Sequence, residues 1–326
     1  MYLRAELAAL NVDDAPQRRA QDRTYRGFAA WRAQAESAAW GEALARFGAG
    51  ADLAQCHALA ALFGSDPDPA AALVAGVTAA GVAALTAEPL SHIPLRHGGD
   101  AARATLLLGQ AGDAALSLVA RSGTALAAVP APTAATFAPA RHWLRVIAGS
   151  ARVTRLTFGA DGAIEPRPLT RGRLTLIPGD VLDRDALSEA LHFTGISGTL
   201  VTLDLNRRDR RADVAREVAL ADGAPLRQSA CDPRDSLHEL MAALLGQMAR
   251  TDAAPALAAL AQTDAPAPLR WQVLREAIAL DTRAGFAALS AVANRPGDPL
   301  ARAAHDLRAQ LQAAHPQLRA LASCPA

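Results

Sequence analysis

The sequence predicts an α+β protein in which helical regions flank a central group of antiparallel strands. Residues 1–88 and 231–326 carry apolar side chains at helical spacing, whereas residues 89–230 contain short β-rich runs separated by Gly, Pro and Asp. A chain of 326 residues is long enough for two or three domains with a sizeable core. We therefore expect an N-terminal helical region (1–88), a β-barrel (89–230) and a C-terminal helical domain (231–326).

The composition excludes several classes of function. Lys+Arg is 33 against Asp+Glu 32, so the net charge of +1 provides no long-range attraction for nucleic acid. All of the positive charge is arginine, and the absence of lysine excludes Schiff-base and P-loop lysine chemistry. Cys56, Cys231 and Cys324 form no CxxC motif, and the N-terminus lacks the apolar core of a signal peptide. Free thiols and a cytoplasmic location are expected.

The N-terminal region shows helix signals. The stretch "RTYRGFAAWRAQAESAAWGEALARF" places Phe28 and Trp31 on one face, and Asp68 followed by Pro69 is a helix start. Residues 69–87 form a run of 19 uncharged residues, close to the length of a membrane span. Because the run is mostly Ala and Gly and lacks flanking arginine clusters, we expect a buried helix, and a membrane-associated helix is the alternative.

The central region predicts an antiparallel sandwich or barrel. Residues 152–158 alternate between polar and apolar, and Gly149-Ser150 and residues 159–162 are turn signals at hairpin spacing. Four aromatic side chains in this region are expected to fill the barrel interior: Phe137, Trp143, Phe158 and Phe193.

The C-terminal region predicts helical hairpins. Asp232-Pro233 and Asp298-Pro299 are helix-start signals, and an apolar pattern repeats at a period of about thirty residues, as a short solenoid would.

Two resemblances add to this interpretation. The stretches "LRVIAGSARVTRLTF", "GRLTLIPGDVL" and "ALHFTGISGTLVTLDL" resemble the second half of a cupin barrel, and their spacing is also similar to the thiol-dioxygenase branch of that family. The C-terminal hairpins resemble HEAT-type repeats. The resemblances imply a cupin-like barrel followed by a HEAT-like helical tail.

The cupin resemblance raises the question of a metal ion. A mononuclear cupin site uses an HxH pair and a later histidine, because residues two apart on a strand point to the same face. This sequence has no HxH pair. Four separate histidines are the possible substitutes: His92, His97, His142 and His192. Of these, His192 lies in the closing strands, where cupins often have a histidine.

We therefore expect a non-catalytic binding or regulatory protein without a cofactor. Its helical tail would contact a protein partner, and its barrel would hold a small-molecule ligand or serve as a scaffold; nucleic acid and membranes are not expected as partners. The alternative is a mononuclear non-haem metal-dependent oxygenase of the thiol-dioxygenase-like cupin type, with Fe²⁺ or another divalent metal on the four histidines.

Overall fold

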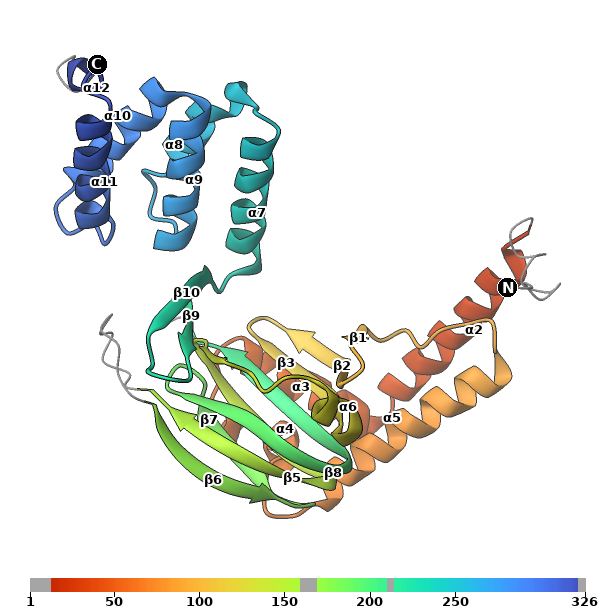
Figure 1. Cartoon of the computed structure of the whole chain (residues 1–326). Coiled ribbons are helices and arrows are strands. Elements are labelled where there is room, and N and C mark those ends of the chain that lie inside the picture. Colours follow the sequence, from red (N-terminus) through yellow and green to blue (C-terminus); the bar gives the residue numbers. More distant parts are fainter. Residues whose placement is uncertain (1–12, 159–168, 210–213, 322–326) are drawn as a thin grey trace. The chain divides into compact units, whose positions relative to one another are not determined.

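The computed structural model describes residues 13–158, 169–209 and 214–321 (Figure 1). The chain forms two compact units. The first unit consists of residues 1–133, 140–163 and 168–209, and the second of residues 134–139, 164–167 and 210–326. Antiparallel strands and helices occur in both units, so the α+β class is confirmed.

The helices of the first unit share a core with its sheet. Phe28, Trp31 and Phe47 pack in one cluster with Leu116 and Leu205 of the strands. The predicted region 1–88 is therefore not separate from the strands that follow it, because the apolar faces of its helices are buried against them. The helices of this unit are α2 (Ala15–Arg32), α3 (Ala35–Gly48), η1 (Leu53–Gln55), α4 (His57–Ala61), α5 (Asp68–Ala87) and α6 (Gly123–Ala128).

Helix α5 corrects the expectation of a buried helix. It packs beside α2 (Figure 1), but only one stripe of it, including Leu73 and Val77, is buried. Its most apolar window has a mean hydropathy of 1.9 and is only 17% buried. By length and composition alone, α5 could cross a membrane. Its alanines leave most of its circumference exposed because only the buried stripe carries the packing.

The first unit contains a curved antiparallel sheet of seven strands in the order β1-β2-β3-β8-β5-β6, with β7 also paired to β5 (Figure 1). The long strands β5 and β8 pair along most of their lengths and carry several bulges, which bend the sheet. Gly149 lies at the bend with φ of +80°, and a Cβ there would lie 2.2 Å from the Thr199 carbonyl oxygen. The strands are β1 (His97–Gly99), β2 (Arg103–Ala111), β3 (Ala114–Ser122), β5 (Ala140–Thr157), β6 (Thr170–Leu176), β7 (Val181–Asp185) and β8 (Glu189–Arg208).

The register separates two faces of this sheet. Trp143 pairs with Leu205, and both belong to the core formed with the helices; we call this side the helix face. The opposite side, the inner face, carries Leu144, Asp204 and, beyond the bend, Phe193. Phe193 therefore fills the inner face as expected, whereas Trp143 packs on the ring of Phe47, with centroids 5.5 Å apart.

The second unit combines a small sheet with helices. Strands β4 (Ala134–Phe137), β9 (Val214–Ala219) and β10 (Pro225–Ala230) form a sheet in the order β10-β9-β4, so Phe137 lies outside the first unit. The predicted boundary at residue 231 differs from the observed one: strands β4, β9 and β10 group with the C-terminal helices, and the second unit contains residues 134–139 and 210–326. The helices are α7 (Pro233–Gln247), η2 (Thr251–Ala253), α8 (Ala254–Leu260), α9 (Ala267–Leu280), α10 (Thr282–Ala293), α11 (Ala301–Ala314) and α12 (Leu318–Leu321).

The two predicted helix starts in this unit have different outcomes. Asp232 caps α7 as expected, since its carboxylate accepts a hydrogen bond from the Arg234 backbone N–H at 2.8 Å. The Asp298-Pro299 signal lies just before α11, which starts at Ala301; the Asp298 carboxylate accepts a hydrogen bond from the Leu300 N–H at 2.9 Å and also pairs with Arg270. Cys56 is a buried free thiol, Cys231 is half-buried, and Cys324 lies outside the described residues.

Candidate functional site

A cluster of charged side chains lies on the inner face of the curved sheet. Asp204 of β8 is 3% exposed, and its Oδ2 atom lies 3.6 Å from His142 Nε2 and 3.7 Å from Arg121 NH2. Arg121 also lies over the ring of Phe193, 4.6 Å from its centroid. The other Asp204 oxygen is buried without a hydrogen-bond partner. These ion contacts are longer than direct hydrogen bonds, so the cluster is held by charge and burial rather than by close pairing.

The hydrogen bonds of His142 identify its tautomer. Arg184 Nε donates to His142 Nδ1 at 3.1 Å, so Nδ1 carries a lone pair and the ring proton is on Nε2, facing Asp204. Burial lowers the pKa of His142, and the positive charges of Arg184 and Arg121 lower it further. The nearby Asp204 carboxylate raises it, but by less. Burial alone would raise the pKa of Asp204, but its contacts with His142 and Arg121 outweigh burial and lower it. We infer a neutral imidazole beside an ionised carboxylate.

The lowered pKa of His142 predicts a pH dependence of stability. The unfolded chain binds a proton on this residue at a higher pH than the folded chain does, so the free energy of unfolding falls as the pH drops through and below the ordinary histidine range, about 6.5. In His142→Asn this part of the slope is expected to disappear, because asparagine can still accept from Arg184 but does not titrate. Denaturant unfolding between pH 7 and pH 5 measures it. His305→Asn, at an exposed position, is the control, and an equal change in both variants would contradict the prediction.

The structure places the four predicted metal ligands in different surroundings. His142 is in β5 within the charged cluster, and His192 is half-buried in β8. His97 in β1 has its Nδ1 3.1 Å from the Leu95 carbonyl oxygen, and the backbone of His92 exchanges two hydrogen bonds with the Gln21 side chain. Within the described ranges, no three His, Cys, Asp or Glu side chains form a group that could hold a metal ion. Metal binding by these histidines stays a prediction, which elemental analysis of untagged protein and of His192→Ala would test.

Two further features of the inner face lie outside the sequence prediction. Arg155 and Glu189 approach to 3.7 Å, and each has a buried side-chain atom without a hydrogen-bond partner. Asp204 and Arg121 were also not among the residues predicted from the sequence. A signal was present, since each is a lone charge within an apolar strand, in "TLVTLDL" and "ALSLVARS".

The second unit carries an exposed apolar row on α7. These side chains lie at positions i, i+3, i+4, i+7 and i+11, so they share one side of the helix, and each is between 50% and 68% exposed. The opposite side of α7 packs into the helical core through Ala242. We call these residues the α7 row: Leu237, Leu240, Met241, Leu244 and Met248.

A groove of about 660 Å³ begins at the α7 row. Leu240 lines it together with Trp271 of α9 and Glu239 of α7. The Glu239 Oε1 atom is buried without a partner, and burial raises the pKa of this carboxyl. A carboxylate beside an indole ring can bind a cationic side chain, and Arg227 of β10, which lines the same groove, already lowers the pKa of this carboxyl by its charge.

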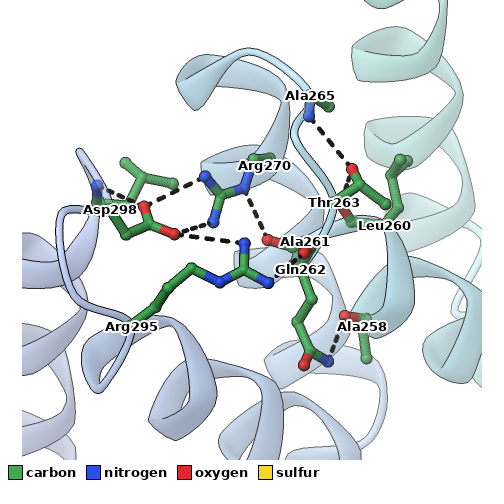
Figure 2. A network of polar contacts seen from close by, with 10 residues as sticks. Ala258, Leu260, Ala261, Gln262, Thr263, Ala265, Arg270, Arg295 and Asp298 are labelled. Carbon is green, nitrogen blue, oxygen red and sulfur yellow. Dashed lines mark hydrogen bonds and ion pairs between the residues drawn. The ribbon is translucent and has the colours of Figure 1, made fainter.

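A buried ion pair joins the loops of the helical part (Figure 2). Arg270 NH2 and Asp298 Oδ2 lie 2.5 Å apart, and the two side chains are 4% and 1% exposed. Arg270 Nε also donates to the Ala261 carbonyl at 2.9 Å, and Arg295 donates to the Gln262 carbonyl at 2.6 Å. The loop after α8 is thereby tied to the loop before α11, which fixes the helices that line the groove.

No protein-family model matches the chain. No curated protein matches it either. Similar solved structures include a putative mannose-6-phosphate isomerase from Ralstonia eutropha, with 18% identity over 34% of this chain and 88% of that chain and a TM-score of 0.24. A cupin superfamily protein from Desulfitobacterium hafniense has 12% identity over 34% and 83%, with a TM-score of 0.23. Oxalate decarboxylase from Lactobacillus farciminis has 13% identity over 41% and 38%, with a TM-score of 0.27.

Of these three proteins, the one from Desulfitobacterium hafniense is described as a cupin superfamily protein. At such identities and TM-scores they say nothing of a ligand, a metal or an activity of this chain. The HEAT-type resemblance of the tail is not tested by them and stays an expectation.

Proposed function

We propose that this protein is a non-catalytic binding or regulatory protein, whose helical unit contacts a protein partner through the α7 row. The observation that carries the proposal is the α7 row itself, a continuous set of five large apolar side chains left open on one helix. Exposed apolar patches of this kind mark interaction surfaces. The cupin-like sheet then serves as a ligand holder or scaffold. The absence of a metal-holding group among the described residues leaves the oxygenase alternative without a supporting observation.

The chemistry of the groove indicates which kind of partner would bind there. Apolar residues at helical spacing on the partner would pack against Leu240 and Leu244, as an amphipathic helix does in an apolar groove. A lysine or arginine on that helix would reach Glu239 and Trp271. We therefore propose a partner helix with an apolar stripe and one basic residue beside it.

A displayed library of helical peptides, selected against the full chain, tests the proposal. Wild-type protein should enrich peptides with apolar residues three and four apart and an adjacent Arg or Lys. Leu240→Glu should weaken the selected peptides by more than about tenfold, because a charge would be buried in the contact. Glu239→Gln should remove only the preference for the basic residue.

The matched control is Ile177→Glu, which changes another exposed apolar residue (53% exposed, against 68% for Leu240) in the first unit, in the segment between β6 and β7. Selection that yields no peptide family, or peptides that bind Leu240→Glu as well as wild type, would overturn the proposal.

A further inference from the structure

A cleft of about 650 Å³ opens in the first unit, beside the residues that follow β3. One wall is formed by α6 and the segment after it, including Leu126 and Val129. The other wall is formed by β5, β6 and β8. A cleft of this volume is large enough for a small organic molecule.

Arg152 places a positive charge on the strand wall of the cleft, and Arg173 of β6 lies beside this wall without lining it. Register places Arg152 opposite Thr175 of β6 and Gly195 of β8, and Thr154 opposite Arg173 and His192. Paired residues share a face, so Arg152, Arg173 and His192 all lie on the same side of the sheet. The two arginines are diagonal neighbours across β5 and β6, with Cβ atoms about 7–8 Å apart in a regular pair.

This positive charge has no acidic counterpart nearby. None of the residues that line the cleft is Asp or Glu. In the part of the chain that the structure describes, neither Arg152 nor Arg173 forms a salt bridge. Most other arginines of this sheet are paired or buried, as Arg141 is with Asp183 at 2.7 Å. The Arg152 guanidinium, which lines the cleft, is therefore available to a ligand, and Arg173 adds positive charge beside it.

The sequence positions Arg152 through the glycine next to it. A Cβ at position 195 would lie 2.8 Å from Arg152 NH2, so glycine leaves room for the guanidinium to lie across β8 at the cleft. Ser150, Thr175 and Ser197 add hydroxyl groups to the same wall. Leu126, Val129 and Ile196 supply apolar surface within the cleft.

We propose that the cleft binds a small molecule with an oxyanion, a carboxylate or a phosphate, attached to an apolar body. The oxyanion is held by Arg152, with Arg173 adding charge, because a planar guanidinium binds such groups through two parallel hydrogen bonds. The apolar body packs on Leu126 and Val129. The inference rests on the proposed function only in treating the sheet as a ligand holder.

The test is calorimetric titration of the full chain with phenyl phosphate and with benzoate, and with benzamide as the uncharged analogue. At least one of the two anions should bind saturably, and benzamide should not. Arg152→Gln should weaken the anion by about 10–100-fold, since a hydrogen-bonded charge contributes about 1.5–3 kcal/mol. The anion that binds more tightly distinguishes a phosphate ligand from a carboxylate ligand.

Arg141→Gln, at another exposed position of β5, is the control and should bind as wild type does. Circular dichroism of each variant verifies folding. The proposal is overturned when neither anion binds at millimolar concentration, when benzamide binds equally well, or when Arg152→Gln binds unchanged. These variants leave the second unit untouched, so a failure here is separate from a failure of the peptide selection.

Discussion

Asp298→Asn is expected to destabilise the helical part of the second unit by about 3–5 kcal/mol. Asparagine has nearly the same shape, so the loss comes from the charge: Arg270 would remain buried without a counter-charge. The loop contacts that depend on Arg270 and Arg295 would weaken with it (Figure 2). Hydrogen exchange of α9, α10 and α11 should accelerate before that of the first unit.

The exposed pair of Arg250 and Asp252 provides the control, because the same two residue types lie 2.7 Å apart in it. Asp252→Asn should leave the exchange rates nearly unchanged, since solvent screens an exposed pair. Equal effects of the two substitutions on hydrogen exchange would contradict the prediction, because they would show that burial of the pair does not determine its contribution to stability.

The destabilisation caused by Asp298→Asn should also depend on pH. Burial alone would raise the pKa of Asp298, but its hydrogen bonds with Arg270 and the Leu300 N–H outweigh burial and lower it. A lowered pKa means that the carboxylate stabilises the fold above the ordinary aspartate value, about 3.9, and that this contribution is lost as the pH falls through the folded pKa. The difference between wild type and Asp298→Asn should therefore shrink below about pH 4.

Asp204→Asn should have an effect of similar size in the first unit, a loss of about 3–5 kcal/mol. The substitution leaves Arg121 and Arg184 largely buried on the inner face with less negative charge to balance them, and burial already lowers the pKa of both guanidinium groups. Thermal unfolding of the full chain, with hydrogen exchange of β3, β5 and β8, measures it.

Asp183→Asn is the matched comparison, because Asp183 forms an exposed pair with Arg141 on the same sheet. Its effect should be at most about 1 kcal/mol. A small effect at Asp204 as well would mean that water, rather than the carboxylate, balances the charge of the inner face.

The local pattern of the sequence predicted much of the secondary structure, but not how the chain divides into units. Alternation over residues 152–158 predicted the second half of β5, and the Asp232-Pro233 signal predicted the start of α7. Spacing along a chain does not reveal which distant elements bury one another. The packing of Phe28 and Trp31 against the strands could therefore not be predicted from the sequence. The same holds for the pairing of β4 with β9.

The charged cluster shows the same limit at the level of a site. The histidine content directed attention to metal binding, and His142 does lie on the inner face. Its partners Arg184 and Asp204 are 42 and 62 residues away in the sequence, and only the register of β5 with β7 and β8 brings them together. The exposure of α5 could not be predicted either, because alanine is compatible with a buried or an exposed helix.

Strand β4 makes the second unit discontinuous in sequence, because residues of the first unit separate β4 from the rest of the second unit. Ala134–Phe137 pairs with residues 216–219 of β9, and β5 to β8 are threaded between these partners as a long insertion. During synthesis, β4 therefore leaves the ribosome well before β9, the strand that pairs with it. β4 can enter its sheet only after the whole insertion has been made. For the same reason, a gene fragment that starts at β9 would encode an open strand edge prone to aggregation, so no single cut separates the two units cleanly.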